Sequence, residues 1–301
     1  MRVAYSPGYV VPLPEGHRFP MPKFALLHER LLAEGLLRAE QVVEPSPAAW
    51  TDLERVHDRV YLENFRRGAL DRGALRRLGL PWSEALVRRS RLAVQGTLEA
   101  VRMAQADGIA ANLAGGTHHA FPDRGEGFCV FNDVAVAIRA ARAQGRLRRA
   151  LVVDLDVHQG NGTAAVFAGD PETYTFSVHG ARNYPFRKLR SSRDVALPDG
   201  TGDSDYLQQL ESHLPFVLEE ARADVAIYVA GVDPVRGDRF GRLALSRGGL
   251  ARRERYVLRT LRAAELPVAI VMGGGYAATP ELTADLHAEV HREARRLVQA
   301  P

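Results

Sequence analysis

Two carboxylates and one imidazole lie close together in the stretch LVVDLDVHQGNG, residues 151–162. Asp154, Asp156 and His158 alternate with apolar residues, and a period of two is typical of a β-strand. In such a strand the three polar side chains point to the same face. Because burying charged groups without a partner is strongly unfavourable, the pattern favours a bound cation.

A third candidate metal ligand, Asp233, follows a different apolar segment, VAIYVAGV. With Asp156 and His158 it would form an Asp/His/Asp site with an open fourth position, which is typical of catalytic rather than structural zinc. Such a metal lowers the pKa of a bound water towards about 7 and polarises a carbonyl oxygen. Each residue alone is more readily explained as a core or helix-capping residue, but three of them at strand ends favour the metal site.

Candidates for acid, base and oxyanion chemistry follow two other apolar segments. His118 and His119 lie in a glycine-flanked loop, and the pKa of histidine lies nearest to neutrality, so the pair suits general acid and base catalysis. Tyr276 follows three glycines, and we expect an exposed phenol there that donates a hydrogen bond to a developing oxyanion. The competing interpretations are a polar loop histidine and an amphipathic rim tyrosine. The glycine run 273–275 lacks the spacing and the lysine of a phosphate-binding loop, and no GxSxG motif indicates a serine hydrolase.

The elements that must position these residues form an alternating pattern. From residue 109 onward predicted strands and helices alternate, and the central strands are continuously apolar. This predicts an α/β fold with a single open, mostly parallel sheet and helices on both faces. Ligands bind beyond the carboxyl ends of the strands in such sheets, so we expect the candidate residues on one rim. No linker or repeat is evident, which predicts one domain over residues 1–301. The expected strands are 2–5, 109–113, 151–158, 173–178, 225–230 and 268–272, and the expected helices are 24–37, 51–59, 61–67, 83–106, 132–144, 163 onward, 203–221, 246–264 and 280 onward.

The composition is typical of a globular protein, with 46% hydrophobic and 25% charged residues among 301. A net charge of +4 is too small to indicate specific nucleic-acid binding. The single cysteine, Cys129, excludes an intrachain disulfide and a zinc site built from several thiolates. The sequence shows neither a signal-peptide pattern nor an apolar run of about 18 residues, so we expect a cytoplasmic protein without a membrane partner.

Four separated motifs resemble those of the zinc-dependent histone deacetylases. In chain order they are GGTHHAFPDRGEGFCVFNDVAVA, VVDLDVHQGNGTA, AGVDPVRGDRFGRLALS and GGGYA. The resemblance covers nearly the whole chain and is strongest to class IV and to bacterial histone deacetylase-like amidohydrolases. It implies the arginase/deacetylase fold and hydrolysis of an acyl amide, with an acetylated protein or a small acetylated amine as the substrate.

The resemblance also implies where the metal and the substrate bind. One Zn²⁺ per chain would be held by Asp156, His158 and Asp233. A monovalent cation, K⁺, is implied near Asp154 and Ser177. The residues implied to line the acyl-lysine tunnel are Gly127, Phe128, Tyr184, Pro185, Phe186, Phe240 and Lys23.

The catalytic roles are likewise implied by the resemblance. His119 would take a proton from the attacking water and return it to the leaving amine, while His118, held by Asp154, contributes electrostatically. Tyr276 would polarise the substrate carbonyl. Many class I relatives have Asp where this chain has Asn161, the expected partner of His119. Because an amide does not stabilise an imidazolium as a carboxylate does, this departure predicts a less basic His119.

Two other functions fit parts of the pattern. A ureohydrolase of the same fold would need a binuclear manganese site with further Asp ligands, whereas residue 161 is Asn and Asp233 is followed by Pro234 and Val235. A non-catalytic binder of acyl-lysine or of a metabolite would not need the complete set of reactive residues. The motifs leave open the oligomeric state, and whether the substrate is an acetylated protein, an acetylpolyamine or another acetylated metabolite.

Overall fold

Eight strands form one sheet in the computed structural model, which describes residues 1–299. The strands are β1 (Arg2–Ala4), β2 (Val42–Val43), β3 (Ile109–Asn112), β4 (Ala150–Asp154), β5 (Thr173–Gly180), β6 (Arg193–Leu197), β7 (Val225–Val229) and β8 (Val268–Val271). Their order in the sheet is β2-β1-β3-β8-β7-β4-β5-β6, and each neighbouring pair is parallel. The predicted α/β fold with one parallel sheet is therefore confirmed.

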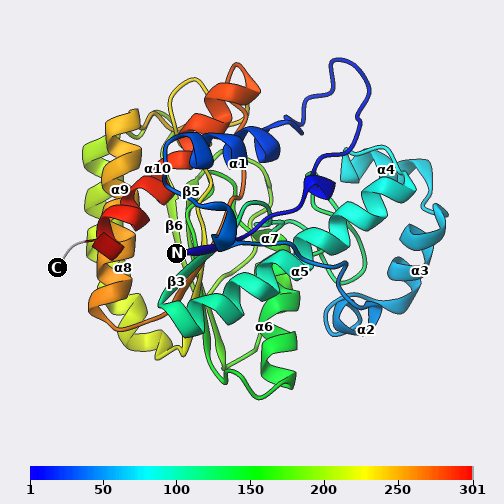
Figure 1. Cartoon of the computed structure of the whole chain (residues 1–301), viewed down its shortest axis with the longest axis horizontal. Helices are drawn as coiled ribbons and strands as arrows, with labels where there is room; N and C mark the ends of the chain where they lie inside the picture. The colour runs from blue at the N-terminus through cyan, green and yellow to red at the C-terminus, as the bar shows by residue number, and fades with distance from the viewer. Residues whose placement is uncertain (300–301) are drawn as a thin grey trace.

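Helices cover both faces of this sheet (Figure 1). They are α1 (Lys23–Ala33), α2 (Trp50–Leu53), α3 (Arg59–Arg67), α4 (Arg72–Leu78), α5 (Glu84–Asp107), α6 (Asp133–Ala143), α7 (Asn161–Val166), α8 (Asp203–Ala221), α9 (Arg247–Ala263) and α10 (Pro280–Gln299), with short 3-10 helices η1 (Pro7–Tyr9) and η2 (Ala39–Gln41). Helices α8, α9 and α10 lie on one side of the sheet, with α1 packed against α10, and α5 and α6 lie on the other side. No helix within residues 1–299 has the length and apolar character needed to cross a membrane.

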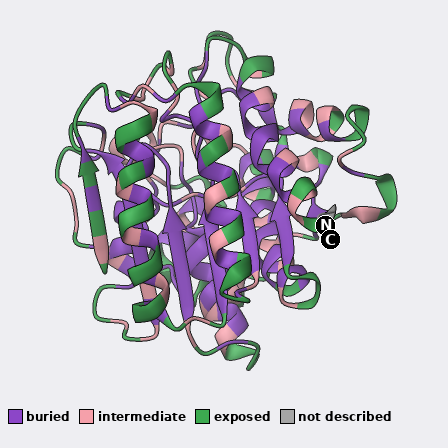
Figure 2. Cartoon of the chain, turned by 90° about the vertical axis from the view of Figure 1, so that its left-hand side faces the viewer, coloured by how far each residue is buried: buried purple, intermediate pink, exposed green. Residues whose placement is uncertain are grey.

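The core lies on the central strands. Every residue of β3, β4, β7 and β8 is buried. Figure 2 shows buried strands behind helices whose outward sides are exposed. Covering a strand on both faces favours an uninterrupted apolar sequence, and burying one Val, Leu or Ile side chain contributes about 1.5–3 kcal/mol. The sheet therefore provides a well-packed base for the loops that leave its carboxyl edge.

Side-chain caps set the starts of helices α5 and α6. Ser83 Oγ accepts a hydrogen bond of 3.0 Å from the backbone N–H of Leu86 at the start of α5. Asn132 Oδ1 accepts one of 3.0 Å from Ala135 at the start of α6. Each cap satisfies a backbone N–H group that has no partner inside the helix. The caps therefore fix where these two helices begin.

The central strand β4 ends earlier than the sequence pattern predicts. It ends at Asp154, and Asp156 and His158 lie in the loop beyond it. The prediction that all three side chains share one strand face was therefore wrong. The physical reason is that side-chain carboxylates replace strand partners here: Asp154 Oδ1 accepts from the N–H of Asp156 at 3.2 Å, and Asp233 Oδ1 accepts from that of Val157 at 2.8 Å.

Three short elements, β2, β6 and α4, were not predicted. β6 is an edge strand whose sequence RDVAL begins with two charged residues, so its alternation is too short to stand out. α4 has only seven residues. Its start is set by Asp71 Oδ1, which accepts from the N–H of Ala74 at 2.7 Å. Such short elements depend on neighbours more than on their own pattern.

Candidate active site

Loops from five adjacent strands meet at the carboxyl edge of the sheet. These strands are β3, β8, β7, β4 and β5, in that spatial order. Because β4 pairs with β7, the loop with Asp156 lies beside the loop with Asp233. Because β3 pairs with β8, the loop with His118 lies beside the loop with Tyr276. The candidate residues therefore gather on one rim, as expected for a parallel sheet.

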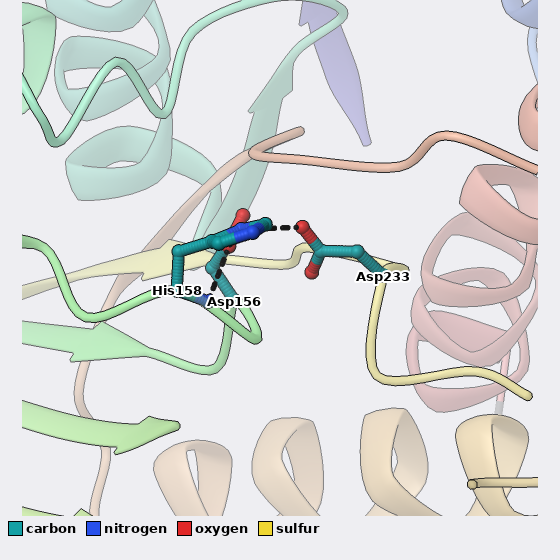
Figure 3. Close-up of side chains that lie close together, drawn as sticks. All are labelled: Asp156, His158 and Asp233. Carbon is teal, nitrogen blue, oxygen red and sulfur yellow. Dashed lines mark hydrogen bonds and ion pairs between the residues drawn. The ribbon is translucent and has the colours of Figure 1, made fainter. Parts of the chain in front are cut away.

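Asp156, His158 and Asp233 turn toward one another (Figure 3). Nδ1 of His158 lies 2.9 Å from Oδ1 of Asp156 and 3.1 Å from Oδ2 of Asp233. One ligand atom from each residue lies within 4.8 Å of the others, and all three residues are buried. Among residues 1–299 this is the one group of three or more His, Cys, Asp or Glu side chains with the geometry to hold a metal ion.

The donor atoms of this cluster fit a divalent cation. Oδ2 of Asp233 is buried, and it lies 3.1 Å from Nδ1 of His158 with no well-aligned hydrogen bond among residues 1–299. The outer carboxylate oxygens are oriented by backbone amides, because Val157 N donates to Asp233 Oδ1 at 2.8 Å and Gly274 N donates to Asp156 Oδ2 at 2.6 Å. Such hydrogen bonds fix metal ligands in place. Two carboxylates and one imidazole are a ligand set that zinc takes with a fourth position open.

The electrostatics of the cluster also favour a cation. Burial, together with the carboxylate of Asp156, raises the pKa of Asp233 to about 7. Burial lowers the pKa of His158, but the hydrogen bonds and charges of Asp156 and Asp233 outweigh it and raise this pKa to about 10. Two buried carboxylates repel one another unless positive charge lies beside them. A metal ion supplies that positive charge without a proton.

Glycine is required at residue 274, inside the run of three glycines. A Cβ atom there would lie 2.1 Å from Oδ2 of Asp233 and 2.7 Å from Oδ2 of Asp156. Any other residue would force these two carboxylates to shift. The glycine run therefore lets the backbone approach the carboxylates closely, which is a use of glycine unrelated to phosphate binding.

His118 is held as a cation by two carboxylates. Its Nδ1 lies 2.7 Å from Oδ2 of Asp154, and its Nε2 lies 3.9 Å from Oδ1 of Asp156. Burial lowers the pKa of His118, but the charges of Asp154 and Asp156 more than offset burial and raise it to about 9. Asp154 therefore lies against His118, and the imidazole keeps its second proton at neutral pH.

His119, the next residue, is neutral. Burial and the neighbouring charges of His118 and His158 lower its pKa well below the usual value. Its Nδ1 lies 2.7 Å from Oδ1 of Asn161. Because an amide oxygen only accepts hydrogen bonds, Nδ1 of His119 carries the proton and Nε2 is left as a free base. Two adjacent imidazoles with pKa values pushed apart are a natural acid/base arrangement.

Glu126 contributes to this arrangement, although the sequence did not single it out. Its Oε1 accepts hydrogen bonds of 2.8 Å from Nδ2 of Asn161 and from the hydroxyl of Tyr184. The first bond turns the amide so that its oxygen faces His119, which sets the tautomer of His119. Glu126 lies inside the motif that carries the histidine pair, but nothing in its spacing separates it from Asp123 in the same loop.

Tyr276 lies at the site, and the prediction of an exposed phenol was wrong. The residue is only 8% exposed. Its ring packs against Phe240 and Phe128, with centroid distances of 4.8 Å and 6.0 Å. Burial, reinforced by the charge of Asp156, raises the pKa of Tyr276 well above its usual value. The hydroxyl therefore keeps its proton and can donate a hydrogen bond.

An outer pocket of about 450 Å³ reaches His119, His158 and Tyr276. Five of the seven predicted tunnel residues line it, namely Gly127, Phe128, Tyr184, Phe186 and Phe240. Phe186 is 85% exposed and so offers an apolar surface at the opening. Pro185 is buried and is not among the lining residues. The pocket therefore combines aromatic walls with a polar base.

Lys23 lies away from this outer pocket. With Arg89 it borders an inner cavity of about 40 Å³ that also contacts His118 and Tyr276. Its Nζ donates to the carbonyl oxygen of Gly273 at 3.2 Å, and burial lowers its pKa to about 8. The predicted position in the acyl-lysine tunnel therefore needs correction: the first residue of α1 points its amine to the inner side of the site.

The two residues implied to bind a monovalent cation are neighbours. Asp154 on β4 is the register partner of Ser177 on β5. Ser177 Oγ lies 2.9 Å from Nδ1 of His179, and Asp154 accepts the hydrogen bond from His118 described above. K⁺ at this position stays a prediction.

Arg253 on α9 connects the two loops that carry the candidate metal ligands. Its guanidinium is buried and donates to the carbonyl oxygens of Leu155 at 3.1 Å and Gly231 at 2.8 Å. Its charge is paired with the buried carboxylate of Glu254. The pair therefore holds both loops against the helix layer.

We expect Arg253→Met to lower the free energy of unfolding by about 3–5 kcal/mol, because Glu254 is left buried without its partner. Urea unfolding measured by circular dichroism gives this value. Arg252→Met is the matched control, since it removes an exposed ion pair with Asp203 that contributes about 0–1 kcal/mol. Equal losses of unfolding free energy in both variants would show that the buried pair of Arg253 and Glu254 does not stabilise the fold.

Comparisons with known proteins agree on one family. A family model described as "Histone deacetylase domain" matches residues 17–292. The chain is 50% identical over 295 residues to an uncharacterized protein of Picosynechococcus sp., covering 97% of this chain and 98% of that protein. It is 30% identical over 287 residues to histone deacetylase 2 of Arabidopsis thaliana, covering 91% and 74% of the two chains. Among solved structures, an HDAC homolog from Aquifex aeolicus superposes with a TM-score of 0.82 at 25% identity, over 98% of this chain and 84% of that chain.

Proposed function

The chain belongs to the histone deacetylase family, and from that premise we propose that it is a zinc-dependent amidohydrolase. It would remove acetyl or other acyl groups from an N-acyl-lysine or an acetylated amine by attack of water on the amide carbonyl. One observation carries the proposal. His158 of the buried Asp/His/Asp cluster, the neutral His119 and the protonated Tyr276 meet at the base of one pocket.

In this proposal the bound metal, His119 and His118 have separate catalytic roles. When bound by the cluster, zinc supplies a Lewis acid that polarises the carbonyl and makes the attacking water more acidic. Nε2 of His119 is unprotonated and accepts the proton of the attacking water, then returns it to the leaving amine nitrogen. The imidazolium of His118 stabilises the negative charge that develops on the carbonyl oxygen.

Tyr276, in the loop after β8, also supports the proposal. Its protonated hydroxyl donates a hydrogen bond to the oxygen of the amide carbonyl as charge develops there. The rings of Phe128 and Phe240, which line the same pocket, would enclose an aliphatic chain and exclude water from it. A long aliphatic amine with an acyl amide at its end matches a pocket that is apolar along its walls and polar at its base.

Hydrolysis assays with acetyl-lysine peptides and acetylpolyamines, with metal content measured in the same samples, test this function. We expect about one zinc per chain, loss of turnover on chelation and recovery when zinc is returned. Two manganese ions per chain would favour a ureohydrolase instead. A protein that turns over no acyl amide, although it is folded and contains zinc, would favour a binding protein.

We expect a carboxylate at residue 161 to move the acidic limb of the pH profile of kcat/KM to higher pH. An Asp beside His119 stabilises the imidazolium, which raises the pKa of His119, so the free base is lost at a higher pH. A shift of one pKa unit corresponds to about 1.4 kcal/mol of stabilisation. A pH series with an uncharged acetyl-lysine peptide measures the shift.

The carboxylate of Glu126 requires a second substitution beside Asn161→Asp. In Asn161→Asp alone, the new carboxylate would face Oε1 of Glu126, which now accepts from the amide at 2.8 Å. The informative variant is therefore Asn161→Asp with Glu126→Gln, compared with Glu126→Gln alone. If the acidic limb is the same in both, His119 is not the base that the profile reports.

A further inference from the structure

Five arginines line the opening of the outer pocket. They come from four separate parts of the chain: the loop before α1, helix α4, the loop after β5 and the loop after β7. No Asp or Glu lines this pocket, although the whole chain has 36 acidic residues against 40 basic ones. We call these residues the mouth arginines; they are Arg18, Arg77, Arg182, Arg239 and Arg242.

Most of the mouth arginines have no carboxylate partner. All five are exposed. Within residues 1–299, the guanidinium groups of Arg18, Arg77 and Arg182 take part in no hydrogen bond or ion pair. Arg239 donates only to backbone carbonyl oxygens. Arg242 alone pairs with a carboxylate, that of Asp199 at 3.3 Å. Four of the five positive charges are therefore available to a ligand.

Two carboxylates beside the opening of the pocket, those of Asp238 and Glu126, are directed to other partners. Asp238 Oδ1 accepts from the backbone N–H groups of Phe240 at 2.9 Å and Gly241 at 3.0 Å, and its Oδ2 accepts from that of Tyr276 at 2.6 Å. Glu126 accepts from Asn161 and Tyr184, as described above. Neither side chain lines the pocket, so the surface that a substrate meets on entry is positively charged.

We propose that the substrate carries carboxylate or phosphate groups beside its acylated amine. This rests on the proposed function and names the class of amide that the site would take. Guanidinium groups bind both kinds of anion through paired hydrogen bonds. An acetylpolyamine, or a peptide with lysines on both sides of the acylated one, would bring positive charge to a mouth that already repels it.

The contribution of these charges depends on ionic strength. Exposed charges chiefly raise the rate of association, and the effect weakens as the screening length falls from about 30 Å at 0.01 M salt to about 3 Å at 1 M. Several weak ion pairs together give a preference of about tenfold in kcat/KM. We expect that preference at low salt for acetyl-lysine flanked by Asp over acetyl-lysine flanked by Lys, and much less of it at 1 M salt.

The experiment uses four short peptides with one acetyl-lysine each, flanked by Asp, phosphoserine, Ser or Lys. Wild type is compared with Arg77→Glu and with Arg77→Glu combined with Arg182→Glu, in which the order of preference should flatten or reverse. Arg76→Glu is the matched control. Arg76 is exposed on the same helix but does not line the pocket, and its substitution changes the net charge by the same amount as Arg77→Glu. The Asp and phosphoserine peptides show which anion is preferred.

A second readout separates this inference from the proposed function. Fluorescence anisotropy measures binding of the labelled peptides to chelated, metal-free protein, where no hydrolysis is needed. Turnover of the Ser peptide without any preference by charge would overturn the inference and leave the function intact. If no peptide is hydrolysed, the proposed function fails, and the order of binding affinities still decides the inference. An equal loss of preference in Arg76→Glu would also overturn it.

Discussion

We expect the Asp233→Asn variant to lose nearly all turnover and to bind zinc more than about 100-fold more weakly than the wild type. Residues that only orient a ligand contribute about 10–100-fold to metal affinity, and Asp233 offers a buried carboxylate oxygen beside the imidazole of His158. The amide of Asn presents a neutral oxygen in place of that carboxylate. Metal content after dialysis, measured together with hydrolysis of a neutral acetyl-lysine peptide, gives both quantities.

The same variant should be more stable than the wild type when both are metal-free at pH 8. Burial and Asp156 raise the pKa of Asp233 to about 7, so the native state resists ionising this carboxyl. Because this pKa is raised, the contribution of the Asp233 carboxyl to the free energy of unfolding is fully present below its unfolded-state pKa of about 3.9. That contribution is lost as the pH rises through the folded-state pKa. Asn does not ionise, so the variant avoids this loss at pH 8 and shows no advantage near pH 4.

Urea unfolding of chelated protein at both pH values measures this difference. The matched control is Asp123→Asn, a carboxylate in the loop after the histidine pair that pairs with Arg124 at the surface. It should retain zinc, turnover and the stability of the wild type. Asp233→Asn protein that still contained one tightly bound zinc would contradict the ligand assignment, whatever its activity.

Tyr276→Phe should lower kcat by about 100–1,000-fold while zinc content and KM stay near the wild-type values. Removing one donor that stabilises a developing oxyanion has an effect of this size. The phenylalanine ring keeps the packing against Phe240 and Phe128, so only the hydroxyl is lost. An interaction made chiefly in the transition state lowers kcat without weakening substrate binding. Steady-state kinetics with a neutral acetyl-lysine peptide separate the two parameters.

Tyr184→Phe is the matched control, because this second tyrosine lines the same pocket and its ring lies 4.9 Å from that of His119. Its hydroxyl already donates to Glu126 at 2.8 Å and so does not face the substrate carbonyl. We expect a much smaller loss of kcat. Full turnover in Tyr276→Phe, or an equal loss in both variants, would show that the hydroxyl of Tyr276 does not stabilise the oxyanion.

Both the fold and the cluster of candidate metal ligands could be predicted, because each polar residue of interest follows an apolar strand. Continuous runs such as 225–229 and 268–271 report burial on both faces, which is a local property of the chain. Parallel strands place all their carboxyl ends on one edge, so Asp156, His158 and Asp233 were expected to meet before the order of the strands was known. Motif similarity then named the family.

The partners of these residues depended on tertiary structure. Only the pairing of β4 with β7 and β5 shows that β4 ends at Asp154, since Asp233, one of the two carboxylates that replace its strand partners, lies 76 residues away from Val157 in the chain. The role of Glu126 depends on Asn161 and Tyr184, which lie 35 and 58 residues away in the chain. A local pattern carries no information about such contacts, so the spacing of Glu126 gave no sign of its function.

The stretch from residue 151 to 162 also combines features set by the local sequence with features set by tertiary contacts. The sequence by itself predicted a buried strand and the candidate metal ligands Asp156 and His158, because apolar period and residue type are local, but it placed both ligands inside the strand. The tertiary structure decided that β4 ends at Asp154, that Tyr276 is buried, that Lys23 lies on the inner side and that arginines from four segments surround the pocket. Each of these depends on which distant segments the sheet order and the helix packing bring together, and chain folding in three dimensions sets that order.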